Sequence, residues 1–190
     1  MLKLRNMSSR LLDSPQRYGL VSRLFHWAMV AVLTWQLTGM VLKITIGREN
    51  AIAAFIMGTH KPVGALLMLL VLLRAAWALL QWRRRPRQPG TLRGRVATAA
   101  HGLMYLLMLY IPFVALMRDY GRGRGFSPFG IPLFPETGQQ VDWMMAPASA
   151  SHGLMGWTLL ALIVGHILMV AVHQAFLRDG TAARMAGRLG

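Results

Sequence analysis

The stretch that decides the fold runs from residue 152 to residue 176 and reads HGLMGWTLLALIVGHILMVAVHQAF. Its 25 residues include three histidines and no Asp, Glu, Lys or Arg. A helix of this length is about 38 Å long, which exceeds the roughly 30 Å of hydrocarbon in a bilayer. The stretch therefore predicts a transmembrane helix with unusual polar residues inside it.

Three further apolar stretches precede it along the chain. We expect one membrane domain over residues 1–190, an all-α bundle of four transmembrane helices at about 21–42, 62–82, 96–117 and 152–176. A short segment at 51–59 is expected at the membrane surface, and a loop rich in Gly and Pro at 118–147. Only 14% of the 190 residues are charged, against about 25% in soluble domains.

Basic residues predict the orientation of the four spans. The chain has 21 Lys and Arg against 6 Asp and Glu, a net charge of +15. Most cations lie in three segments that four spans place on one side: Lys3, Arg5, Arg10, Arg17, Arg23, Arg83, Arg84, Arg85, Arg87, Arg93, Arg95, Arg178, Arg184 and Arg188. Because cytoplasmic segments carry this excess, we expect both termini in the cytoplasm of a bacterial inner membrane. The basic runs are interpreted as topology anchors, with no nucleic-acid partner.

The six histidines carry the functional signal: His26, His60, His101, His152, His166 and His173. The chain has no cysteine, which excludes disulfides, iron–sulfur clusters, Cys-bound zinc and c-type haem attachment. His152 and His166 are 14 residues apart, so they share one helix face at about 21 Å axial separation. Paired imidazoles are axial ligands of b-type haem, which helix bundles hold between facing helices. The spacing predicts two b haems, one near each membrane surface.

Depth in the membrane suggests partners for these two histidines. His60 is the outer partner for His152, whereas His166 can pair with either His26 or His101. Depth alone does not choose between these two. His173 shares the face of His166 but lies about 10 Å nearer the cytoplasm. It is placed for the edge of an inner haem or for a quinone head-group.

Several short motifs occur in a characteristic order along the chain. They are Tyr18 with Phe25-His26-Trp27, Thr59-His60-Lys61 with Gly64, Ala100-His101-Gly102 with Tyr105, and then His152, His166 and His173. From Tyr18 to Phe176 the sequence resembles the bacterial di-haem cytochrome b561 family. One departure is Ser151, which stands where some relatives have a Trp before the outer histidine.

The resemblance implies specific roles for the histidines. His26 and His166 would ligate the iron of the cytoplasmic-side haem, and His60 and His152 that of the periplasmic-side haem. His101 and His173 would then be contacts for quinone or haem propionates. Their alternative role is hydrogen bonding between helices.

The resemblance also implies an oxidoreductase that takes electrons from superoxide outside and reduces ubiquinone in the membrane. Cations expected on the outer side would attract the superoxide anion or anchor lipid head-groups: Lys61, Arg118, Arg122 and Arg124. The alternative function is a cytochrome b relay subunit between quinone and a separate partner, such as a hydrogenase or formate dehydrogenase. A haem-free transporter or scaffold is a third possibility.

Overall fold

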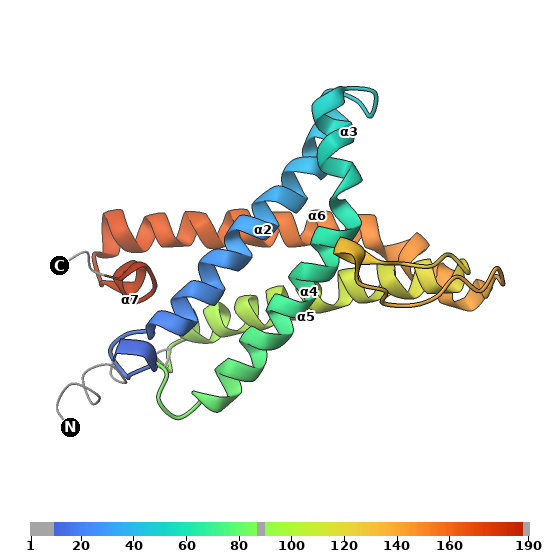
Figure 1. The fold of residues 1–190 in the computed structure, drawn as a ribbon. Coiled ribbons are helices and arrows are strands. Elements are labelled where there is room, and N and C mark those ends of the chain that lie inside the picture. The colour runs from blue at the N-terminus through green and yellow to red at the C-terminus, as the bar shows by residue number, and fades with distance from the viewer. Residues whose placement is uncertain (1–9, 87–89, 188–190) are drawn as a thin grey trace.

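The computed structural model describes residues 10–86 and 90–187 (Figure 1). Four of the topology residues, Lys3, Arg5, Arg87 and Arg188, lie outside the described residues. The long helices are α2 (Leu20–Thr45), α4 (His60–Leu80), α5 (Leu92–Gly121) and α6 (Asp142–Val172). All four are long and apolar enough to cross a membrane. The predicted all-α bundle of four spans is confirmed.

Shorter elements connect or follow the long helices. They are α3 (Ala51–Gly58), the 3-10 turn η1 (Pro128–Gly130), the π-helix η2 (His173–Leu177) and α7 (Thr181–Ala186). The segment that was expected at the membrane surface thus forms α3. Asn50 caps it, because its side-chain oxygen accepts a hydrogen bond from the Ile52 N–H at 3.0 Å.

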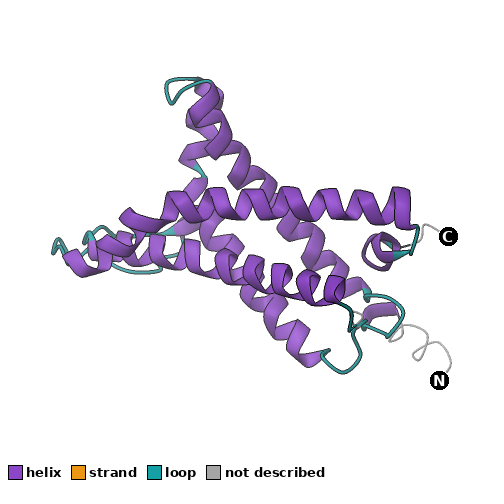
Figure 2. Cartoon of the chain, turned by 180° about the vertical axis from the view of Figure 1, so that it is seen from behind, coloured by secondary structure: helices purple, strands orange, loops and turns teal. Residues whose placement is uncertain are grey.

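The long helices form two antiparallel pairs, α2 with α4 and α5 with α6, which cross one another (Figures 1 and 2). The pairs also touch through α4 and α5. We call the end that holds α7 and residues 81–86 the inner end. The outer end holds α3 and the connection between α5 and α6. The segment that precedes α2 lies at the same end as α7, since the Tyr18 N–H donates a hydrogen bond to the Arg184 carbonyl at 3.2 Å.

The structure differs from the predicted boundaries at the outer end. α5 continues to Gly121 and α6 begins at Asp142, so the outer connection covers 122–141 instead of 118–147. Pro147, which looked like a boundary in the sequence, lies inside α6. Asp142 in the first turn favours this earlier start, because a carboxylate stabilises the positive end of the helix dipole.

The buried core lies between the two crossed pairs, and all four long helices contribute to it. Its residues are Met29, Leu67, Val71, Met104, Leu107, Met108 and Leu159. Many other large apolar side chains face outward, among them Leu24, Leu69, Leu106 and Leu168. Such an apolar exterior is stable in lipid, where it needs no burial.

Candidate functional site

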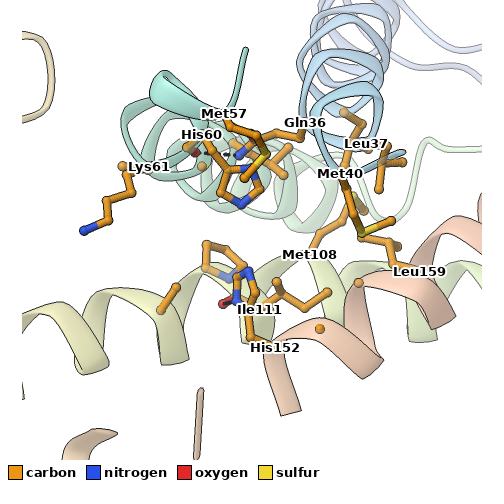
Figure 3. A pocket seen from close by; sticks show the side chains of 18 of the residues that line it. Gln36, Leu37, Met40, Met57, His60, Lys61, Met108, Ile111, His152 and Leu159 are labelled. Carbon is orange, nitrogen blue, oxygen red and sulfur yellow. Dashed lines mark hydrogen bonds between the residues drawn. The ribbon is translucent and has the colours of Figure 1, made fainter. Parts of the chain in front are cut away.

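His60 and His152 face each other at the outer end of the bundle (Figure 3). Their ring centroids are 6.1 Å apart and the ring planes are inclined by 72°. The Nδ1 of His152 lies 3.3 Å from the carbonyl oxygen of Ile111. A carbonyl that accepts from Nδ1 leaves Nε2 free to bind a metal. The buried Nδ1 of His60 has no hydrogen-bond partner among the described residues.

These two imidazoles border a cavity of about 380 Å³ between the four long helices. Its wall is mostly apolar and includes Met40, Met57 and Met108. Gly64 and Gly153 also line it, and an added Cβ at Gly153 would meet nothing within 4 Å. An apolar cavity with facing imidazoles and glycine in its wall fits a flat haem macrocycle.

Gln36 joins α2 to the outer histidine. Its Nε2 donates a hydrogen bond to the His60 carbonyl at 2.9 Å (Figure 3). An added Cβ at Gly64 would lie only 2.9 Å from this same nitrogen. Glycine at residue 64 therefore keeps the space that the amide of Gln36 needs to hold the start of α4.

Charged side chains lie around the same cavity at the outer end. Lys43, Lys61, Arg118 and Asp119 line it. The Nζ of Lys61 is 2.9 Å from Oδ2 of the buried Asp119, and Nη1 of Arg122 is 3.8 Å from its Oδ1. Lys61 extends away from the two imidazoles (Figure 3). Two of the four predicted anion-attracting cations are thus paired with one carboxylate.

Three histidines lie near one another toward the inner end. The ring centroids of His101 and His166 are 5.1 Å apart, with planes inclined by 82°. His26 lies within electrostatic reach of both, and of Arg74. His101 is exposed, and its Nδ1 contacts the Ala97 carbonyl oxygen one turn earlier, at 2.6 Å. His26 and His166 are half-buried.

Helix packing separates the two possible inner pairs. His101 and His166 belong to α5 and α6, which pack directly against each other. By contrast, α2 and α6, which carry His26 and His166, are not closely packed partners over the described residues. The same holds for α4 and α6, which carry His60 and His152. A flat cofactor needs space between helices. The cavity beside His60 and His152 offers it at the outer end, and at the inner end α2 and α6 are not in close contact, unlike α5 and α6.

His173 begins the π-helix η2 at the inner end, past His166 along α6. Its Nδ1 is 2.6 Å from Oδ2 of Asp179, whose Oδ1 accepts from the Thr181 N–H at 3.0 Å. The hydrogen bonds from Thr181 and then His173 lower the pKa of Asp179 to about 2. The carboxylate is therefore ionised beside the imidazole at neutral pH.

Arg74 and Gln36 are buried inside the spans and were not predicted as functional residues. The signal for Arg74 was present, since it is the only charged residue between 62 and 82. A charge inside a transmembrane segment is a functional candidate by default. The role of Gln36 depends on where α4 begins, which hydropathy does not fix.

Comparison with known proteins agrees with this geometry. The family model described as Prokaryotic cytochrome b561 matches residues 17–188. The chain belongs to the prokaryotic cytochrome b561 family. The chain is therefore a multi-pass membrane protein that transfers electrons and binds b-type haem. Its facing imidazoles agree with this assignment.

Two relatives place this cytochrome b561 within its family. Cytochrome b561 homolog 2 of Escherichia coli (strain K12) is 27% identical over 181 residues, covering 93% of this chain and 94% of that protein. Probable superoxide oxidase CybB of Yersinia pestis is 26% identical over 91 residues, covering 47% of this chain and 51% of that protein. The family resemblance found in the sequence is thereby confirmed.

Proposed function

We propose that this cytochrome b561 is one membrane domain that carries electrons from superoxide at its outer end, through two b haems, to ubiquinone at its inner end. The observation that carries the proposal is the presence of two imidazole clusters on α6, one around His152 and one around His166. The similarity to a probable superoxide oxidase supports the choice of donor.

The outer haem would be held by His60 and His152, and the inner haem by His26 and His166. The outer pair borders the apolar cavity. For the inner pair, direct packing of α5 on α6 argues against a macrocycle between His101 and His166. The exposure of His101 and its contact with the Ala97 carbonyl oxygen also favour a supporting role.

When bound, the haems supply one-electron carriers at two depths in the membrane. Each superoxide loses one electron and leaves as dioxygen. Ubiquinone takes two electrons and two protons to become ubiquinol, so two superoxide anions are needed for each quinone. His173 and Asp179 would hold and relay protons at the quinone, because an imidazole that is hydrogen-bonded to a carboxylate can pass a proton on.

The orientation follows from the basic residues. Described cations at the inner end include Arg83, Arg84, Arg85 and Arg93. By the positive-inside rule, these cations support a cytoplasmic position for the inner end and both termini. Superoxide would be oxidised in the periplasm, and protons for the quinone would come from the cytoplasm.

The test is superoxide-driven reduction of ubiquinone by the purified, haem-loaded protein in lipid nanodiscs without any other protein. We expect ubiquinol to form at a rate proportional to the enzyme, with one quinol for two superoxide anions. Heat-denatured protein supplies the control. Haem that is reduced by superoxide but is not reoxidised by ubiquinone would contradict the proposed acceptor.

One observation favours the relay function as a second candidate. The outer connection exposes three large apolar side chains, Phe129, Ile131 and Leu133. Exposed apolar groups on a connecting loop are suited to docking a partner subunit. In that case the purified chain would be inactive with superoxide, and only addition of the partner would restore quinone-linked electron transfer.

A further inference from the structure

Arg74 is a buried cation inside the membrane-spanning part of α4. Only 8% of its surface is exposed. It lies six residues before the helix ends at Leu80, which is about 9 Å along the axis. Arginines near helix ends usually extend to the lipid head-groups. Arg74 instead points between the helices.

Two hydrogen bonds hold the guanidinium in this place. Its Nη1 donates to the Ser22 carbonyl on α2 at 2.9 Å, and its Nε donates to the hydroxyl of Tyr105 on α5. Ser22 precedes His26 by one helical turn, and Tyr105 follows His101 by one turn. Arg74 is therefore fixed beside the histidines of the inner cluster, and it lies within electrostatic reach of His26.

No carboxylate of the protein balances this charge. All six acidic side chains of the chain, Asp13, Glu49, Asp119, Glu136, Asp142 and Asp179, lie within the described residues. Those that form ion pairs there do so with Lys61, Arg85, Arg122 or His173, and none with Arg74. A buried charge without a counter-ion is unfavourable, so the site favours an anion from outside the chain.

We propose that Arg74 binds a propionate carboxylate of the inner haem and thereby sets the position and potential of that haem. A guanidinium has five N–H donors, and the two bonds to Ser22 and Tyr105 leave three for a carboxylate. The inference rests on the proposed inner haem at His26 and His166. It adds an anchor on α4, a helix that supplies no ligand to that iron.

The experiment is redox titration of the haem-loaded protein with Arg74→Gln, Arg74→Lys and, as the matched control, Arg83→Gln. Arg83 is an exposed arginine just beyond the same helix. We expect Arg74→Gln to lower the midpoint potential of the component that His166→Ala removes, because a nearby cation favours the reduced, more negative haem. Haem rebinding to the stripped protein should weaken about tenfold or more. Arg74→Lys should restore part of both losses, and Arg83→Gln should change neither.

Tyr105→Phe keeps the test open if Arg74→Gln does not fold. It removes one acceptor of Arg74 but keeps the ring, so the same haem component should shift in the same direction by less. Nanodiscs of phosphatidylcholine alone exclude anionic lipid as the source of the counter-ion, and the shift should persist in them.

Three results would overturn the proposal. One is an unchanged potential with only a lower melting temperature, which would make Arg74 a purely structural link between helices. Another is a raised KM for ubiquinone at unchanged potential, which would assign Arg74 to the quinone. The third is a shift in the component that His152→Ala removes. If His166→Ala removes no haem component, the inner haem itself is misassigned. The proposed function then fails, and this outcome is distinct from the three results above.

Discussion

The outer and inner histidine clusters are built differently although they share α6. The outer pair borders an open, apolar cavity, and its neighbouring charges come from three helices and include a buried carboxylate, Asp119. The inner cluster brings three imidazoles together beside one buried arginine. The outer site thus has charged side chains at the border of its cavity, whereas the charge near the inner site, Arg74, is buried between the helices.

The largest effects should come from removing one ligand from each cluster. His152→Ala should abolish the outer haem component and His166→Ala the inner one, since each iron loses one of its two axial ligands. Redox titration with optical spectra measures the components that remain. Loss of the same component from both variants would show that the two clusters do not hold separate haems.

The inner cluster gives the next test, because three histidines compete for two ligand positions. We expect His26→Ala to remove the inner haem component and His101→Ala to retain a low-spin bis-histidine spectrum. The reason is that α5 and α6 pack directly against each other, which disfavours a macrocycle between them. Electron paramagnetic resonance of both variants distinguishes them, and the opposite pattern would assign the iron to His101.

A smaller effect is expected at the quinone. His173→Leu or Asp179→Asn should slow reoxidation of reduced haem by ubiquinone roughly tenfold, while superoxide-driven haem reduction stays normal. Because the pKa of Asp179 is about 2, its carboxylate stays ionised and adds no inflection to the rate above about pH 4. Stopped-flow measurement separates the two half-reactions. Equal loss in both would indicate a structural role for this pair.

The smallest effect concerns the charged side chains at the outer cavity. Asp119→Asn releases Lys61 and Arg122 from their carboxylate, so the local positive potential rises. Superoxide-driven haem reduction should speed up about two- to threefold at low salt, and the gain should vanish at about 1 M salt through screening. Glu136→Gln on the outer connection is the charge-matched control. A rate that is unchanged at low salt would mean that these cations do not guide superoxide.

Hydropathy and helical period were sufficient to predict the four spans and the two layers of histidine. The shared face of His152 and His166 depends only on their spacing within one helix, so tertiary structure was not needed. The start of α6 was predicted too late, because a proline usually marks the end of a helix or loop, whereas Pro147 lies inside α6. Pairing of Lys61 with Asp119 was not predictable, since it depends on how α4 crosses α5.

The inner cluster shows the same limit. Depth in the membrane left His26 and His101 equivalent, and the family resemblance pointed to His26. The contrast between the packed helices α5 and α6 and the separated helices α2 and α6 supports the same choice. Arg74 was visible as a lone charge in an apolar span, yet its partners Ser22 and Tyr105 belong to two other helices. Helix packing determines which side chains point into the interior of the bundle. This packing cannot be read from a single sequence.

We propose that one chain holds two b haems, one at each histidine cluster. The most direct test is a pyridine haemochrome assay on purified protein from haem-replete cells, with the protein quantified by amino-acid analysis. We expect two b haems per chain, falling to one in His152→Ala and in His166→Ala. One haem per wild-type chain would contradict the two-cluster account, and no haem would contradict electron transfer by this chain altogether.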